Sequence, residues 1–142
     1  MEFFPAPFKP PKEPFAVLVF IWQNDKVLLA RIRDRGWCIP SGRIEPGETP
    51  TQAAIRESVE EVAADISNPI PIGYFKITKN DVVKWAIAFT SSVVSLNDFI
   101  PTPESANRKS FMLSQLPEIY YLWNPLTEAV FQCARTVVQE KS

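Results

Sequence analysis

The chain contains no histidine, and this absence removes several classes of active site at once. A Ser-His-Asp triad, a Cys-His pair and a zinc site of mixed Cys and His ligands all require an imidazole. Acid–base or metal chemistry would therefore depend on carboxylates, with Lys or Tyr as lesser options. Grouped carboxylates prefer hard cations such as Mg²⁺ or Mn²⁺. The composition thus predicts that acidic side chains carry any catalysis.

Cysteine, excess charge and long apolar runs are also scarce. Cys38 and Cys133 are the only cysteines, and the apolar setting of Cys38 favours buried free thiols over a disulfide. The 15 basic and 16 acidic residues give a formal charge of −1, which gives no sign of a nucleic-acid or membrane partner. The chain also lacks an apolar run of the roughly 18 residues that span a bilayer, and a signal-peptide pattern at its start. We therefore expect a cytoplasmic protein.

The pattern of elements predicts one α/β domain. Residues 1–14 are rich in Phe and Pro and are expected to form an extended polyproline or irregular arm, whose aromatics pack on the body or on a partner chain. Residues 15–142 are expected to form the single domain. Apolar alternation and turn residues predict strands over 15–23, 26–32, 71–78, 82–94 and 111–113, loops over 39–48 and 97–109, and a closing helix over 125–139.

A second helix has a strong start signal. Thr49 is a good N-cap, Pro50 suits the first helical position, and Gln52 completes a capping box. The apolar residues expected to face the core at helical spacing are Ala54, Ile55, Val59 and Val62.

This arrangement leaves Glu57, Glu60 and Glu61 together on another side of the helix. Like charges at this spacing repel by a few tenths of a kcal/mol per pair, so something should offset that cost. A divalent cation between the carboxylates would do so. The alternative is a solvated helix face in which Arg56 pairs with Glu60.

The spacing of the charged residues extends beyond the helix. Gly42 is followed after five residues by Glu48, and after seven more by the run Arg56-Glu57-Ser58-Val59-Glu60-Glu61-Val62-Ala63-Ala64. With "WCIPSG" (37–42) before it, this stretch resembles the signature of Nudix hydrolases. The resemblance implies a Nudix-like α/β/α sandwich with a mixed β-sheet, a loop–helix–loop catalytic motif, and Mg²⁺ (or Mn²⁺) as cofactor.

The resemblance also implies roles for single residues. Glu57, Glu60 and Glu61 would bind the metal, together with the backbone carbonyl of Ser41, and Glu57 is also a possible catalytic base. Glu48 would support the metal shell or orient the loop. Arg56 would hold Glu57 in position. A further base comes from a later loop in the family, and Glu104 occupies that place, with Asp98 as a weaker candidate.

The substrate would bind beside these residues. Arg31, Arg33 and Arg43, with Arg35, could hold a polyphosphate tail, although each could equally be an exposed residue of a hairpin or turn. Trp37 could stack on a nucleobase, whereas most of the other aromatics fit the core of a sheet.

Three positions depart from the family pattern. Ser41 replaces the first of two usual glycines, Ser58 stands where an aliphatic residue is usual, and Ala63 replaces a glycine that normally ends the helix. None of the three removes a metal-binding side chain. If Ala63 adopts a positive φ, it costs on the order of 1 kcal/mol relative to Gly.

The substrate prediction follows by elimination. Sub-motifs typical of ADP-ribose, diadenosine polyphosphate and coenzyme A hydrolases are missing, so the chain is most similar to MutT-type nucleoside triphosphate pyrophosphohydrolases, with oxidised purine nucleotides among the candidate substrates. The alternatives are a catalytically impaired nucleotide-sensing module, and a hydrolase of ADP-ribose or another nucleotide sugar. The arm and the "IYYLW" segment (119–123) favour a homodimer.

Overall fold

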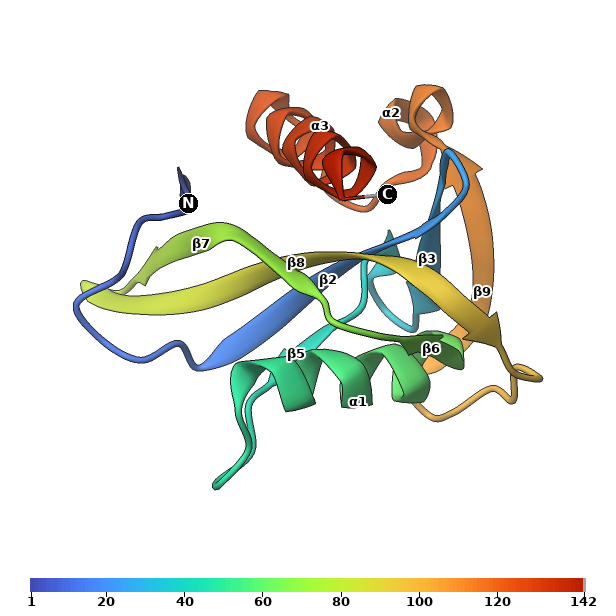
Figure 1. Ribbon diagram of the computed structural model, residues 1–142, viewed down its shortest axis with the longest axis horizontal. Helices are drawn as coiled ribbons and strands as arrows, with labels where there is room; N and C mark the ends of the chain where they lie inside the picture. Colours follow the sequence, from blue (N-terminus) through green and yellow to red (C-terminus); the bar gives the residue numbers. More distant parts are fainter. Residues whose placement is uncertain (142) are drawn as a thin grey trace.

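A mixed β-sheet lies between two helices in the computed structural model, which describes residues 1–141 (Figure 1). Within these residues the sheet follows the order β1-β7-β8-β2-β3-β4, with β5 beside β2, β6 beside β8 and β9 beside β3. The strands are β1 (Glu2–Pro5), β2 (Ala16–Gln23), β3 (Lys26–Ile32), β4 (Gly36–Cys38), β5 (Ser41–Arg43), β6 (Ala64–Ile66), β7 (Ile70–Lys79), β8 (Val82–Leu96) and β9 (Ser105–Met112). The helices are α1 (Pro50–Val62), η1 (Leu113–Gln115), α2 (Leu116–Ile119) and α3 (Pro125–Glu140).

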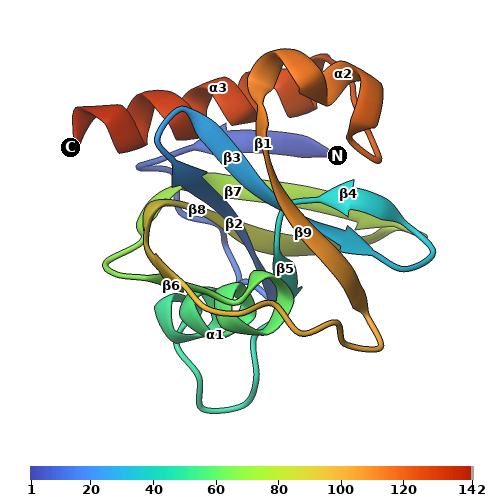
Figure 2. The same cartoon turned by 90° about the vertical axis from the view of Figure 1, so that its right-hand side faces the viewer.

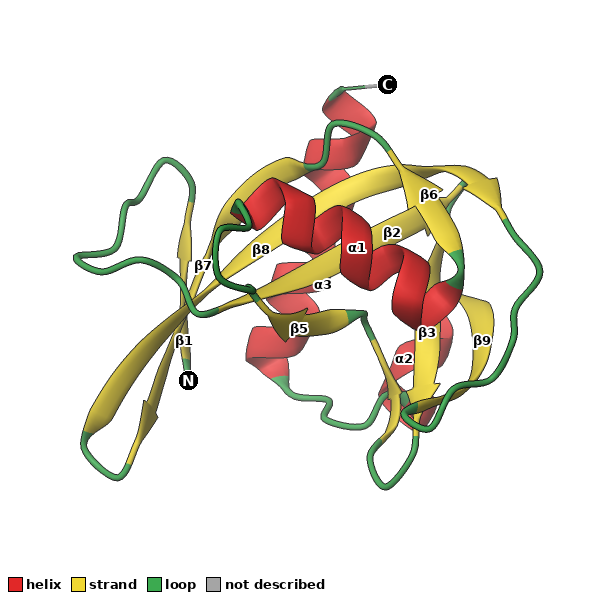
Figure 3. Cartoon of the chain, turned by 90° about the horizontal axis from the view of Figure 1, so that it is seen from below, coloured by secondary structure: helices red, strands yellow, loops and turns green. Residues whose placement is uncertain are grey.

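The layers confirm the predicted α/β/α sandwich. Seen from below, α1 lies in front of the sheet and α3 lies behind it (Figure 3). The sheet is mixed because β2 pairs in parallel with β8 and antiparallel with β3 and β5. Two hairpins form where the sequence predicts them, at turns whose residues Asn24, Asn80 and Asp81 all have positive φ. No helix within residues 1–141 has the length and apolar character that crossing a bilayer requires.

Two predicted loops contain strands. β5 (Ser41–Arg43) lies inside the predicted loop 39–48, and β9 begins at Ser105, within the predicted loop 97–109. β9 is an antiparallel neighbour of β3, and its polar residues alternate between exposed and partly covered positions. The sequence of such a strand predicts a loop, because the strand is stabilised by hydrogen bonds to its neighbour and shows no apolar alternation of its own.

Residues 2–5 of the N-terminal arm form a strand, where a polyproline or irregular segment was predicted, whereas the other residues of 1–14 lie outside helices and strands, as predicted. β1 pairs antiparallel with β7, and the ring of Phe3 lies 5.0 Å from that of Phe75. Phe8 packs against Trp85 at 5.5 Å. Gly73, at φ 151°, permits this docking because a β-carbon there would overlap the carbonyl oxygen of Phe4. The arm's aromatics therefore pack on the body of the same chain.

The two cysteines are free thiols. Cys38 is buried and Cys133 is half-buried. Burial raises the pKa of the Cys38 thiol to about 11.

Candidate active site

Helix α1 begins as its sequence predicts. The Thr49 hydroxyl accepts a hydrogen bond from the Gln52 amide at 3.1 Å, and the Gln52 side chain accepts one from the Thr49 amide at 2.9 Å. Pro50 occupies the first turn, where its missing N–H leaves no bond unmade. This capping box fixes where the helix starts and hence the angular position of every residue after it.

The face that α1 turns to the sheet differs from the prediction. Ala54, Ser58 and Val62 are fully buried, whereas Val59 is 44% exposed. The prediction for Val59 is wrong because the buried stripe follows i, i+4 and i+8 from Ala54. Ser58 fits this stripe because its hydroxyl donates to the Ala54 carbonyl at 2.7 Å, so no buried polar group is left unpaired.

Because Ala54, Ser58 and Val62 face the sheet, two carboxylates of α1 lie at the edge of the core. Glu57 and Glu61 are each only 8% exposed. Burial raises the pKa of both side chains, and that of Glu61 reaches about 7. The Arg56 guanidinium opposes the rise in the pKa of Glu57, and the Ser41 amide, which donates to Glu61 Oε1 at 2.9 Å, opposes that of Glu61.

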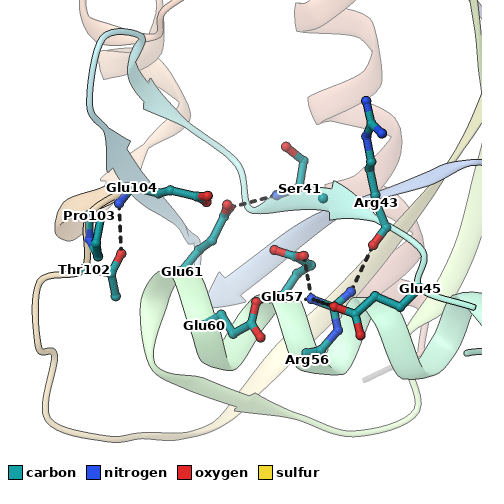
Figure 4. Close-up of a pocket in the computed structure, with 11 residues that line it drawn as sticks. Ser41, Arg43, Glu45, Arg56, Glu57, Glu60, Glu61, Thr102, Pro103 and Glu104 are labelled. Carbon is teal, nitrogen blue, oxygen red and sulfur yellow. Dashed lines mark hydrogen bonds and ion pairs between the residues drawn. The ribbon is translucent and has the colours of Figure 1, made fainter.

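Arg56 connects the carboxylates to the loop before the helix. Its Nη1 donates to Glu57 Oε1 at 2.8 Å and to Glu60 Oε2 at 3.1 Å. Its Nε donates to Glu48 Oε2 at 2.8 Å. Its Nη2 donates to the Arg43 carbonyl at 2.9 Å, as Figure 4 shows. One guanidinium therefore fixes the loop, the first turns of α1 and the Glu57 carboxylate relative to one another.

The carboxylates line an open pocket of about 540 Å³ between β5, α1 and the loop that precedes β9. Figure 4 shows the carboxylate of Glu104 directed toward that of Glu61 across this pocket. Its negative charge adds to the raised pKa of Glu57 and of Glu61. The lining residues are Ser41, Gly42, Arg43, Glu45, Arg56, Glu57, Glu60, Glu61, Thr102, Pro103 and Glu104.

Glu48 does not line this pocket. It accepts hydrogen bonds from Arg56 at 2.8 and 2.9 Å and from the Glu45 amide at 3.0 Å. These bonds lower the pKa of the Glu48 carboxyl to about 2. This placement fits the loop-orienting role more closely than that of a metal ligand.

The predicted substrate-binding residues are dispersed. Arg43 lines the pocket, but its guanidinium points away from the carboxylates (Figure 4). Arg31 lies outside the lining, and the Arg33 guanidinium donates to the Thr102 carbonyl at 3.3 Å. Trp37 packs edge-on against Phe111 with ring centres 5.0 Å apart. Asp98 also lies outside the lining.

The donor set suits a hard cation, although the carboxylates are not gathered around one point. Within residues 1–141, no three acidic or cysteine side chains have the arrangement of a ready-made metal site. Arg56 bonds to an oxygen of Glu57 and to an oxygen of Glu60. All the donors are oxygen atoms, and two of the carboxylates are buried without full neutralisation, so the residues fit Mg²⁺ or Mn²⁺ by chemistry.

Sequence reasoning named Gly42 only as part of the signature, and it missed two further residues that shape the site, Ser105 and Arg108. A β-carbon at Gly42 would overlap the Glu57 carboxylate, so only glycine allows this approach. The buried Ser105 hydroxyl donates to the Glu61 carbonyl at 2.8 Å, and Arg108 donates to the Val62 carbonyl at 2.8 Å. The last two bonds cap the C-terminus of α1 from β9, and no local sequence pattern could indicate them.

The backbone conformation differs at two of the positions that depart from the family pattern. Ala63 adopts the left-handed conformation, at φ 50° and ψ 41°, and its amide bonds back to Val59 O at 3.0 Å. This is the position where glycine is favoured. Ser41, by contrast, is not among the residues of 1–141 with positive φ, so its backbone needs no glycine.

The protein is thus an α/β/α sandwich in which carboxylates of a loop–helix motif line a pocket beside the mixed sheet. The sequence profile of the NUDIX domain matches residues 12–128. The chain therefore belongs to the NUDIX family, as the resemblance in its sequence predicts.

Individual relatives agree with this assignment. A dihydroneopterin triphosphate diphosphatase of Escherichia coli is 42% identical over 59 residues, which are 39% of each chain. A Bacillus subtilis protein provisionally named 8-oxo-dGTP diphosphatase is 31% identical over 65 residues, or 45% of this chain and 44% of that one. The chain thus matches less than half the length of these curated relatives. In overall fold it is similar to a mutant Bacillus subtilis pyrophosphohydrolase, with a TM-score of 0.79 at 21% identity over 99% of this chain and 91% of that chain.

Proposed function

We propose that this chain hydrolyses nucleoside diphosphates linked to another group, that it uses Mg²⁺ or Mn²⁺, and that nucleoside triphosphates are its principal substrates. The observation that carries this proposal is the acidic pocket, where Glu57 and Glu61 are buried beside Glu60 and Glu104. Five glutamates line the pocket with two arginines, and of these arginines Arg56 is the one whose guanidinium bonds to the carboxylates. Such a site favours an added cation, and a cation in turn favours a polyphosphate.

The preference for a triphosphate rests on the relatives. One is named for dihydroneopterin triphosphate and the other for 8-oxo-dGTP, so both names denote diphosphatases of triphosphates. These names favour a triphosphate over ADP-ribose or a nucleotide sugar, and oxidised purine nucleotides belong in the first set of compounds to test.

Glu57, Glu60 and Glu61 would hold the cation, and the Ser41 carbonyl would add a backbone oxygen. When bound, Mg²⁺ lowers the pKa of coordinated water and neutralises negative charge on phosphate. Arg56 keeps Glu57 against Gly42, where the carboxylate faces the pocket. Arg43 is the lining arginine whose guanidinium is free of the carboxylates, and it is the candidate for the outer phosphate.

Glu104 would act as the base. A water oxygen forms a bond to phosphorus, its proton passes to the Glu104 carboxylate, and the P–O bond of the anhydride breaks. The electron pair of that bond leaves with pyrophosphate, so a triphosphate yields a nucleoside monophosphate. Glu104 suits this role because its carboxylate reaches the pocket from a different element than the three glutamates of α1.

The direct test is a panel of nucleotides, including oxidised purine triphosphates, incubated with the protein and Mg²⁺. We expect monophosphate and pyrophosphate from the wild type, and a loss of roughly a hundred-fold or more in kcat for Glu57→Gln and for Glu60→Gln. Glu118→Gln is the matched control, because Glu118 is an exposed glutamate on α2, away from the pocket.

Two results would contradict the proposal. Turnover that persists unchanged when a chelator removes the metal would exclude the proposed cofactor. Tight nucleotide binding without turnover of any member of the panel would instead support a sensing module.

A further inference from the structure

The carboxylate of Glu104 reaches the pocket without a hydrogen-bond partner of its own. Glu104 is exposed, and within residues 1–141 no group donates a hydrogen bond to its side-chain oxygens. Its position relative to Glu57 and Glu61 therefore depends on the backbone that carries it. The loop between β8 and β9 runs past α1 before that backbone enters β9 (Figure 2).

A compact set of hydrogen bonds fixes this backbone. The Thr102 hydroxyl accepts a hydrogen bond from the Ser105 amide at 2.9 Å. It accepts a second from the Glu104 amide at 3.3 Å, which Figure 4 shows. The Thr102 amide donates to the Ser105 carbonyl at 2.9 Å, and the Glu104 carbonyl accepts from the Arg33 amide at 2.9 Å. One threonine side chain thus closes a turn directly around Glu104.

The turn is attached to the catalytic helix at its other side. The Ser105 hydroxyl donates to the Glu61 carbonyl at 2.8 Å, and Ser105 is fully buried. β9 also contains a bulge here, since Arg31 pairs with Asn107 and Ile32 pairs with Ser105, which leaves Ala106 as the extra residue. Bulges of this kind change the direction in which neighbouring side chains point.

We propose that Thr102 is a positioning residue: by accepting from the amides of Glu104 and Ser105, its hydroxyl holds the Glu104 carboxylate at the α1 carboxylates. Arg33 assists through two hydrogen bonds: its backbone amide donates to the Glu104 carbonyl and its guanidinium donates to the Thr102 carbonyl. We therefore assign Arg33 to this turn and not to the substrate site. The proposal rests on the hydrolase activity proposed above.

The decisive variant is Thr102→Val, which keeps the shape of the side chain and removes the acceptor. We expect kcat to fall on the order of ten-fold to a hundred-fold with KM little changed, because a displaced base costs rate more than binding. Thr102→Ser restores the hydroxyl and should restore kcat to within about two-fold. Thr78→Val is the matched control, since Thr78 is an exposed residue of β7 away from the pocket.

The coupling to Glu104 separates positioning from a general loss of structure. In a Glu104→Gln background, Thr102→Val should cause no further loss in kcat, because the group that it positions is already inactive. A wild-type kcat in Thr102→Val, or an equal additional loss in the Glu104→Gln background, would overturn the proposal.

A second readout does not require activity. Amide hydrogen exchange at Glu104 and Ser105 in the metal-free protein should accelerate about five-fold in Thr102→Val, as expected for the loss of a bond of about 1 kcal/mol. Unchanged exchange would contradict the positioning role even if the wild type hydrolyses no nucleotide. The absence of turnover in the wild type, in contrast, would count against the proposed function alone.

Discussion

The two helices cover opposite faces of one sheet but pack on it with different kinds of side chain. Beneath α3 the core is rich in large rings, and its buried aromatics are Phe20, Trp22, Phe75, Phe111 and Phe131. Beneath α1 the buried cluster consists of alanine, valine, isoleucine and leucine, with Phe89 as its one aromatic in the described chain. The buried charged residues of 1–141, Glu57 and Glu61, both lie on α1.

This difference indicates that the two faces of the sheet have different roles. Aromatic rings bury large areas, so the α3 face supplies much of the stability. Short side chains let α1 lie close to the sheet, where the Glu57 carboxylate meets the backbone at Gly42. The α1 face therefore gives up apolar contact in order to hold carboxylates in fixed positions. Variants on the two faces should accordingly affect different properties.

The largest expected effect is on the α3 face. Phe131 is 1% exposed, and its ring meets those of Phe20 at 4.9 Å and Tyr120 at 5.1 Å. Phe131→Ala should lower the free energy of unfolding by about 3–5 kcal/mol, measured by urea denaturation. Hydrolysis per folded molecule should stay near the wild-type level. A cost below about 1 kcal/mol would remove the contrast between the faces.

The next effect is on the α1 face and on activity. Gly42→Ala places a methyl group where the Glu57 carboxylate lies, and that flexible carboxylate can move aside. We expect kcat to fall on the order of a hundred-fold, because the displaced group is a proposed metal ligand. Urea denaturation should show a change below about 1 kcal/mol in the free energy of unfolding. Wild-type activity in Gly42→Ala would mean that Glu57 needs no contact with β5.

The smallest expected effect is on stability at the C-terminal end of α1. Ala63 is in the left-handed conformation, where a β-carbon is unfavourable. Ala63→Gly should raise the free energy of unfolding by about 0.5–1 kcal/mol, since relief of strain exceeds the entropy that glycine adds to the unfolded chain. Thermal denaturation would measure the gain, and a lower melting temperature would contradict it.

Much of the fold could be predicted from local patterns. The capping box at Thr49, the turn at Asn24 and the helix start at Asn124 are short-range signals, and each element forms where they indicate. The family could be recognised from the sequence because its signature is a spacing of residues within one loop and the helix that follows it. For the same reason the grouping of Glu57, Glu60 and Glu61 was visible before the structure.

The remaining features depend on long-range pairing. β9 is stabilised by β3, and its polar residues carry no strand pattern of their own. The exposure of Val59 follows from the packing of Ser58, whose hydroxyl is satisfied only within the folded helix. The hydrogen bond from the Arg33 guanidinium to the Thr102 carbonyl joins β3 to a distant loop, and a charged residue in the sequence does not reveal such a partner. The roles of the site residues stay predictions until activity is measured.

The central claim is that the α1 carboxylates bind a divalent cation, and metal-linked stability tests it most directly. At a Mn²⁺ concentration of a hundred times the dissociation constant, the free energy of unfolding of the wild type should rise by about 2.7 kcal/mol. A Glu57→Gln/Glu61→Gln double variant should show no such gain. A Glu118→Gln/Glu128→Gln control, which removes two exposed glutamates from α2 and α3, should keep it. An equal gain in the first double variant and the wild type would contradict the account.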